Sequence, residues 1–209
     1  MGFDIIIKLL ICYLLGSISG SLIIGKIKNV DIRKMGSGNA GATNAFRTQG
    51  LFFSLMVMII DVAKGYIGVS FVANGLSSIP TLLCGISAVL GHVYPIYYNF
   101  KGGKGAGTLI GVLLALFPSY FLLVLLSIWI LIIILSGYVG LSTMVSGLFF
   151  PILLYYNESI QIDDPHFIFS ICIALFLIFT HRQNIVRMIN GDENQFKKAM
   201  ILHKMLKKN

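Results

Sequence analysis

Apolar residues fill most of this chain in long continuous runs, which short polar stretches interrupt. Runs of about 16 to 22 mostly apolar residues suit helices that cross roughly 30 Å of hydrocarbon at 1.5 Å per residue. Continuous runs exclude a membrane β-barrel, whose strands alternate apolar and polar positions. We therefore predict an all-α, polytopic membrane helix bundle with about seven transmembrane helices. The expected spans are about 4–25, 51–73, 79–94, 105–117, 119–136, 143–157 and 166–181.

Two features of these runs affect the span count. A single helix over 105–136 would be about 48 Å long, too long for a bilayer even when tilted. We therefore predict a turn at Pro118, with one bent helix as the alternative. The first run follows Asp4 rather than a basic leader and carries Lys8, so we expect a retained span and not a cleaved signal peptide. Small residues near its end, from Gly16 to Ser21, would let neighbouring helices approach closely.

Composition and charge support a membrane protein and predict its orientation. Hydrophobic residues make up 56% of the chain and charged residues 11%, whereas soluble domains have about 25% charged residues. If the N-terminus is outside, every lysine and arginine except Lys8 and Lys64 lies in an inner loop or the C-terminal tail. This asymmetry predicts an odd number of spans, a cytoplasmic C-terminus and residence in a plasma membrane. Part of the net charge of +8 is then explained by the orientation of the chain in the membrane. Because the sequence also lacks a basic-aromatic RNA-binding motif, we expect no nucleic-acid partner.

We expect one integral membrane domain over residues 1–209, with 192–209 as a short basic cytoplasmic tail. This tail is either a frayed extension or a short helix on anionic headgroups. The three cysteines, Cys12, Cys84 and Cys172, all fall within expected spans. They make neither a disulfide framework nor a zinc spacing, so we interpret them as packing residues.

Four polar islands fall on the predicted inner side, and the first is rich in glycine. Residues 36–41 match GxGxxG, but no strand precedes them, so a dinucleotide site is excluded by context. Glycines here permit positive φ and close backbone approach, so that successive N–H groups can surround an anion. The candidate residues are Gly36, Gly38 and Gly41, with neutral donors on Ser37, Asn39, Thr43 and Asn44 and a phosphate-matching guanidinium on Arg47.

The second island places two lysines in a glycine bend where the fourth span begins. It is no Walker loop, because Tyr98 and Gly105 stand where that motif needs glycine and Ser or Thr. A helix N-terminus favours an anion, so we interpret the island as a binding site, with a plain membrane-anchor loop as the alternative. Its members are Lys101, Gly102, Gly103, Lys104 and Gly105.

The remaining polar groups carry weaker signals. Ser142 opens the sixth expected span, while His181, Asn184 and Arg187 recur at helical spacing after the last one. We interpret all four as candidate ligand-binding groups. Three further residues lie within the spans: Asp61 and Lys64 form either an internal ion pair or part of a wet cavity, and His92 is either a proton shuttle or a structural hydrogen bonder.

Some familiar catalytic patterns are missing. No aspartate lies four residues after His92 or His181, no Asp-rich cluster faces the cytoplasm, and no GxSxG elbow occurs. We therefore expect chemistry without a metal, a cofactor or an obvious acyl-enzyme nucleophile.

Together the segments GSGNAGATNAFR, DVAKG, GHVYPIYYNFKGGKGAGT and HRQNIVRMINGDE closely resemble the motifs of the bacterial acyl-phosphate:glycerol-3-phosphate acyltransferases. The resemblance runs in order over most of the chain up to about residue 195. It implies transfer of a fatty acyl group from acyl phosphate to the 1-hydroxyl of glycerol 3-phosphate, which gives 1-acyl-glycerol 3-phosphate (lysophosphatidic acid) and phosphate. An enzyme that makes acyl phosphate is then a possible partner, besides the two substrates and the lipid bilayer.

The resemblance also implies residue roles. Ser37, Thr43 and Asn44 would hold the acyl phosphate, whereas Lys104, Arg47, His181 and Asn184 would grip glycerol 3-phosphate near Ser142. Lys101 and Arg187 are weaker candidates. The alternative function, a transporter of a phosphorylated metabolite, predicts a matching polar opening outside, yet the outer loops lack basic residues. We expect the polar islands to meet in one pocket that opens to the cytoplasm.

Overall fold

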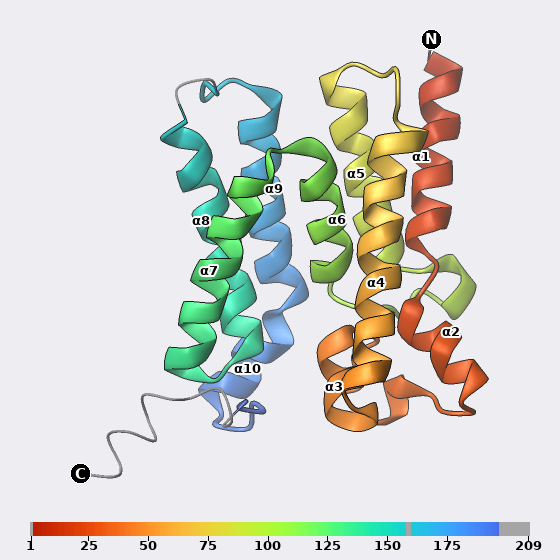
Figure 1. Ribbon diagram of the computed structural model, residues 1–209, viewed down its shortest axis with the longest axis vertical. Coiled ribbons are helices and arrows are strands. Elements are labelled where there is room, and N and C mark those ends of the chain that lie inside the picture. Colours follow the sequence, from red (N-terminus) through yellow and green to blue (C-terminus); the bar gives the residue numbers. More distant parts are fainter. Residues whose placement is uncertain (1, 158–159, 197–209) are drawn as a thin grey trace. The chain divides into compact units, whose positions relative to one another are not determined.

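The computed structural model describes residues 2–157 and 160–196, and across these two ranges the only regular structure is helical. This confirms the all-α prediction. The chain forms two compact units: unit 1 is Met1–Phe117 and unit 2 is Pro118–Asn209 (Figure 1). The predicted turn at Pro118 is confirmed, because one helix ends at Leu116 and the next begins at Ser119.

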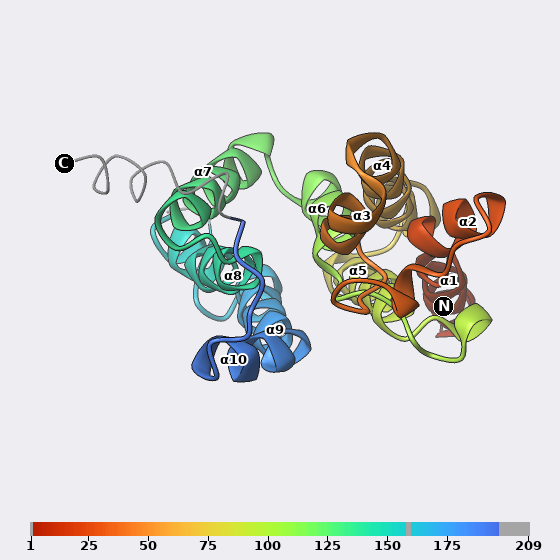
Figure 2. The same ribbon diagram turned by 90° about the horizontal axis from the view of Figure 1, so that it is seen from below.

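Unit 1 is built from helix pairs that pack closely. Helix α1 lies against α5, and α4 lies against α6 (Figure 2). Gly16 faces the backbone of Ala88 and Gly65 faces that of Thr108, where a Cβ would overlap the facing carbonyl oxygen. Small residues thus allow backbone contact between helices. The elements are α1 (Gly2–Gly16), α2 (Gly20–Ile27), η1 (Ile32–Lys34), α3 (Ala42–Gln49), α4 (Leu51–Ile67), the π-helix η2 (Gly68–Val72), α5 (Ser78–Val93), η3 (Ile96–Tyr98) and α6 (Ala106–Leu116).

The first predicted span is not one continuous helix. Helices α1 and α2 are bent by 44° at a break between Gly16 and Gly20. Glycine and serine are poor helix formers, which weakens this stretch locally. The ammonium of Lys64 also donates a 2.6 Å hydrogen bond to the Ile18 carbonyl within the break. The span expected over 4–25 is therefore formed by a bent helix pair, which qualifies as a candidate membrane span when its two helices are counted together.

In unit 2, α8 packs against both α7 and α9, while the short α10 contacts α8 and α9 (Figure 2). Its elements are α7 (Ser119–Ser136), α8 (Val139–Tyr155), α9 (Pro165–Thr180) and α10 (Arg182–Ile189). Helix α8 starts before the predicted residue 143, so Ser142 lies inside its first turn rather than in the preceding loop. The Ser142 hydroxyl donates to the Tyr138 carbonyl at 2.9 Å, a bond that is compatible with the helix.

Helix length and surface composition are those of a membrane protein. In the described ranges, three helices are long and apolar enough to cross a membrane, or up to five if each bent pair counts as one span. Helices α6 and α8 are shorter apolar helices, so the seven spans and the orientation of the termini stay predictions. Large apolar side chains such as Phe52, Phe71 and Leu175 are exposed by 61% or more. Such extensive apolar exposure suits a lipid-facing surface.

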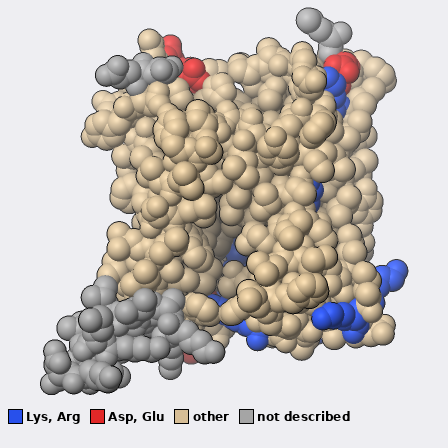
Figure 3. Space-filling model, in the orientation of Figure 1, with Lys and Arg blue, Asp and Glu red and all other residues tan. Residues whose placement is uncertain are grey.

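Charged side chains are unevenly distributed over the surface of unit 1. Lysine and arginine gather at the end that carries α2 and α3 (Figure 3). Near the N-terminus, Lys8 forms an ion pair with Asp4 at 3.6 Å. The segment 197–209, most of the predicted basic tail, lies outside the described residues.

Candidate functional site

The glycine loop (residues 36–44) leads into α3 through two left-handed glycines. Gly36 has φ +56° and Gly38 has φ +72°, so both need glycine for backbone reasons. Gly41 has φ −121° and caps the N-terminus of α3. The loop therefore delivers the chain to a helix start, whose first N–H groups have no partner within the helix and attract anions.

The Asn44 side chain holds the glycine loop together through three hydrogen bonds. Its side chain is 1% exposed, and its Nδ2 donates to the carbonyls of Ile32 at 3.1 Å and Met35 at 2.9 Å. Its Oδ1 accepts from the Ser37 backbone N–H at 2.9 Å. The structure thus joins Ser37 and Asn44 directly. These bonds give Asn44 the geometry of a residue that shapes the loop, with Asn39 and Thr43 on the same segment.

A charged pair supports the glycine loop from the preceding turn. Arg33 donates to both carboxylate oxygens of Asp31, at 3.1 and 3.0 Å. These hydrogen bonds lower the pKa of Asp31 and raise that of Arg33. Arg33 also reaches the Tyr98 carbonyl at 3.3 Å, which ties η1 to the turn before the second island.

The lysine loop (residues 101–105) lies against the end of α5. Gly102 N–H donates to the Val93 carbonyl at 3.2 Å, and Gly103 N–H donates to the His92 carbonyl at 3.1 Å. A Cβ at Gly103 would overlap the His92 ring. Close packing therefore accounts for these two glycines, whereas Gly105 has φ +90° and caps α6. Lys104 stands directly before this helix start.

Because Gly103 contacts the His92 ring, Gly103→Ala should displace the lysine loop. We expect the KM for a phosphate-bearing substrate to rise about tenfold or more, which corresponds to ~1.4 kcal/mol of lost binding. Steady-state kinetics on protein purified in detergent would measure this. Gly68→Ala is the matched control, because a Cβ there meets its nearest atoms at an ordinary 3.6 Å. Equal KM values for the two variants would contradict the assigned role of this contact.

Both glycine-capped helices start at the same end of unit 1. In Figure 1, α3 lies beyond the N-terminal end of α6, and Figure 2 shows the two helices next to each other. Arg47 belongs to α3 and Lys104 precedes α6. Two helix N-termini with a guanidinium and an ammonium make this end of unit 1 suited to phosphate groups.

In unit 2, His181 lies between α9 and α10 and is 5% exposed. Its Nδ1 lies 2.8 Å from the Leu177 carbonyl. A carbonyl can only accept, so Nδ1 carries the proton. A neutral His181 therefore has its lone pair on Nε2. Ser142, which is fully buried, directs its hydroxyl to its own helix through the bond to Tyr138.

Asn184 and Arg187 are linked by an acid that the sequence did not single out. Glu193 accepts from Asn184 Nδ2 at 2.9 Å and from Arg187 Nε at 2.7 Å, and its side chain is 3% exposed. Gly140 on α8 leaves room for Asn184, since a Cβ there would lie 2.9 Å from Nδ2. In the sequence, Glu193 is recognisable only as an acidic residue near the start of the predicted basic tail, and this position does not indicate which residues it contacts.

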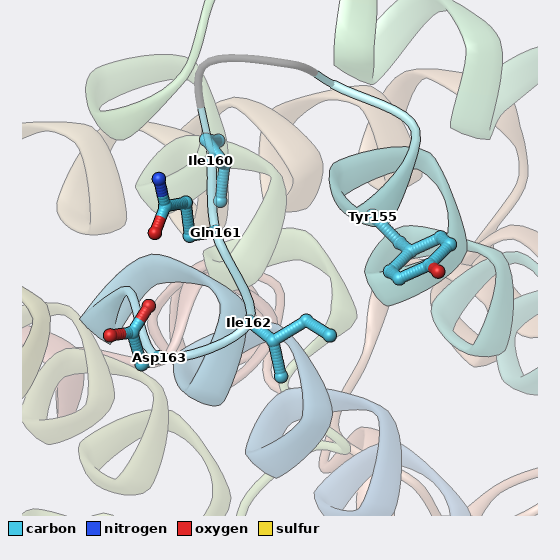
Figure 4. A pocket seen from close by; sticks show the side chains of 5 residues that line it. All are labelled: Tyr155, Ile160, Gln161, Ile162 and Asp163. Carbon is cyan, nitrogen blue, oxygen red and sulfur yellow. The ribbon is translucent and has the colours of Figure 1, made fainter.

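A cavity of about 660 Å³ lies at the other end of unit 2, beside the connection from α8 to α9 (Figure 4). Figure 4 shows the Asp163 carboxylate, the Gln161 amide and the Tyr155 hydroxyl as its polar groups. Among the described residues that line the cavity there is no cation, so this lining does not suit a phosphate. The lining residues are Tyr155, Ile160, Gln161, Ile162 and Asp163.

Known proteins resemble this chain over nearly its whole length. The family model described as glycerol-3-phosphate acyltransferase matches residues 6–191. A glycerol-3-phosphate acyltransferase of Thermosipho melanesiensis is 37% identical over 192 residues, which cover 92% of this chain and 92% of that protein. Glycerol-3-phosphate acyltransferase 2 of Bacillus anthracis is 40% identical over 191 residues, or 91% of this chain and 98% of that protein.

A crystal structure of similar fold is also known. PlsY, described as an integral membrane glycerol 3-phosphate acyltransferase, matches in its glycerol 3-phosphate form with a TM-score of 0.85 and 34% identity, covering 95% of this chain and 98% of that one. Its lysophosphatidic acid form matches with a TM-score of 0.83 and 32% identity, covering 94% and 98%. This chain therefore belongs to the glycerol-3-phosphate acyltransferase family of integral membrane proteins.

Proposed function

We propose that this protein transfers a fatty acyl group from acyl phosphate to the 1-hydroxyl of glycerol 3-phosphate. The observation that carries the proposal is the pair of glycine-capped helix starts at one end of unit 1, accompanied by Arg47 and Lys104. Two substrates that each bear a phosphate group need two such anion-binding positions. The family membership supports the acceptor, and the acyl-phosphate donor is the further step of the proposal.

The proposed residue roles are those that the family resemblance implies. In unit 1, the glycine loop with Ser37 and Thr43 binds the acyl phosphate, and Lys104 and Arg47 bind glycerol 3-phosphate. The catalytic assignments are Ser37, Arg47, Lys104, His181 and Asn184. Substrate-binding assignments are Gly36, Gly38, Asn39, Gly41, Thr43, Asn44, Lys101, Gly102, Gly103, Gly105, Ser142 and Arg187.

The proposed reaction needs alignment and charge stabilisation rather than a covalent enzyme intermediate. The 1-hydroxyl oxygen of glycerol 3-phosphate attacks the acyl carbonyl carbon, and the bond from that carbon to the phosphate oxygen breaks. The departing phosphate takes the hydroxyl proton, so that lysophosphatidic acid and inorganic phosphate are formed. Acyl phosphate is a mixed anhydride with a good leaving group, and cationic side chains stabilise the charge that develops. No cofactor takes part in these steps.

The proposal includes a location. The active site faces the cytoplasm from the plasma membrane, because positive charge favours the inner side. Acyl phosphate is a lipid-like donor, so the bilayer or an acyl-phosphate-producing enzyme would supply it.

Phosphate release tests the donor directly. Purified protein should release phosphate when it receives both acyl phosphate and glycerol 3-phosphate, and it should form lysophosphatidic acid in equal amount. Acyl-CoA and acyl carrier protein, each with glycerol 3-phosphate, serve as comparison donors, scored by lysophosphatidic acid formation. Product from either thioester at the rate seen with acyl phosphate would contradict the donor assignment.

Single-turnover labelling tests the absence of an acyl-enzyme. Protein mixed with radioactive acyl phosphate and then denatured should carry no covalent label. A label on Ser37 or His181 would contradict direct transfer.

A further inference from the structure

Three ionisable side chains lie buried inside unit 1, and the proposed chemistry uses none of them. Asp61 and Lys64 on α4 are 2% and 4% exposed, and His92 on α5 is 4% exposed. Charges within an apolar bundle are costly unless they are paired. Their contacts suggest a task beyond neutralising each other.

Lys64 is the centre of this group. Its Nζ lies 2.6 Å from the Ile18 carbonyl, 2.8 Å from His92 Nδ1 and 3.0 Å from Asp61 Oδ1. The contact with Asp61 is an ion pair that lacks hydrogen-bond alignment. An ammonium can only donate, so His92 Nδ1 accepts and a neutral His92 carries its proton on Nε2. The group as a whole is then electrically neutral.

This group contacts the chain on both sides of Lys104. The His92 carbonyl accepts from Gly103 N–H at 3.1 Å, and the His92 ring lies against Gly103. On the other side, a Cβ at Gly107 in α6 would lie 3.1 Å from the Asp61 Cβ. The position of the lysine loop therefore depends on where Asp61 and His92 are held.

The same ammonium connects to the glycine loop. Ile18 lies in the break between α1 and α2, which the bond from Lys64 stabilises. Just beyond the break, the Ser21 hydroxyl donates to the Ala40 carbonyl at 3.0 Å. One buried side chain thus links the segments that support both loops.

We propose that Asp61, Lys64 and His92 are positioning residues, which hold the glycine loop and the lysine loop at the spacing that two phosphate-bearing ligands require. The nature of those ligands rests on the proposed function, whereas the positioning itself does not. Because the group is neutral, it orients the loops without competing with the cationic side chains for phosphate. The alternative is that the Asp61–Lys64 ion pair only holds α4 in the bundle. In that case, replacing both residues together by uncharged ones would leave the positions of the two loops unchanged.

The decisive variant is the double substitution Asp61→Asn with Lys64→Met. Lys64→Met alone leaves a buried carboxylate without its cation, so we expect it to lower the melting temperature. The double variant removes both charges and should regain most of that loss. It still lacks the bonds to Ile18 and His92, so we expect its KM for glycerol 3-phosphate to rise at least tenfold. Wild-type KM and kcat, within twofold, in this folded double variant would overturn the proposal.

A pair of His92 variants covers the case in which the double variant does not fold. His92→Asn keeps a hydrogen-bond acceptor for Lys64 near the Nδ1 position. His92→Leu fills the space with an apolar side chain and has no acceptor. We expect KM to stay within threefold of wild type in His92→Asn and to rise at least tenfold in His92→Leu. Equal effects in both would count against the positioning role.

Loop position can also be followed without activity. Lys101 is exposed, so Lys101→Cys with Cys172→Ser should react with a water-soluble maleimide. Adding His92→Leu should change the labelling rate severalfold, and adding His92→Asn should change it little. If wild-type protein releases no phosphate, the proposed function fails while this labelling still decides the positioning role. Unchanged labelling in His92→Leu would overturn the inference, whatever the enzyme does.

Discussion

Lys104→Ala should reduce turnover about 100-fold while the protein stays folded. Lys104 stands directly before α6, whose start is capped by the left-handed Gly105. An ammonium beside a helix N-terminus adds a charge-assisted contact to phosphate, and loss of one such preorganised donor typically costs about 2.7–4 kcal/mol in the transition state. Phosphate release from acyl phosphate and glycerol 3-phosphate measures the effect, with thermal unfolding as the test of folding.

Lys34→Ala is the matched control for this variant. Lys34 also lies on the basic end of unit 1, at the end of η1, and it is exposed. Its removal lowers the net charge equally, so general electrostatic attraction falls by the same amount. We expect the control to keep more than half of wild-type turnover. Comparable losses in the two variants would show that Lys104 acts only through overall charge.

Glu193→Ala should clearly lower the stability of unit 2. This carboxylate is almost fully buried and accepts from both Asn184 and Arg187. Truncation leaves two polar groups without their acceptor, which costs about 2–3 kcal/mol, a lower figure than for a fully buried ion pair because Arg187 is partly exposed. We expect the unfolding midpoint to fall by about 5–10 °C, measured by thermal unfolding in detergent.

Two further variants separate the parts of this effect. Glu193→Gln keeps an oxygen for Asn184 but loses the charge that Arg187 meets, so its midpoint should lie between those of wild type and Glu193→Ala. Asp192→Ala removes an exposed neighbouring acid and should leave the midpoint unchanged. A drop in Asp192→Ala as large as in Glu193→Ala would refute the assigned contacts.

The approximate positions of the long apolar helices were predictable from sequence because each apolar run is a local property of the chain, whereas the short helix α3 lies in a segment that was expected to be a loop. Pro118 marked the boundary between α6 and α7 for the same reason, since proline restricts its own backbone and that of the residue before it. The break near Ile18 was not predictable. Glycine and serine weaken the helix there, but small residues also occur inside unbroken helices. The bond from Lys64 to the Ile18 carbonyl comes from far away in the sequence, and no local pattern records it.

The candidate site shows the same division between local and distant causes. Gly36 and Gly38 were recognisable because a left-handed backbone conformation favours glycine at the position itself, whatever lies around it. Gly102 and Gly103 pointed to ligand binding in the sequence, but their packing against the end of α5 also explains them. Glu193 was missed because its importance comes from burial against α10, which hydrophobic patterning does not reveal for an isolated acid.

Helix α6 is shorter than the neighbouring apolar helices α5 and α7 of this chain. Its 11 residues extend about 16 Å, roughly half the thickness of a bilayer's hydrocarbon layer. If α6 is one of the predicted spans, either the lipid thins beside it, or one of its ends stops below the membrane surface. If the recessed end is the one that Lys104 precedes, a water-soluble acceptor would travel down to the level of the fatty chain. The proposed acyl-phosphate donor, which carries an apolar chain, could then react without leaving the lipid.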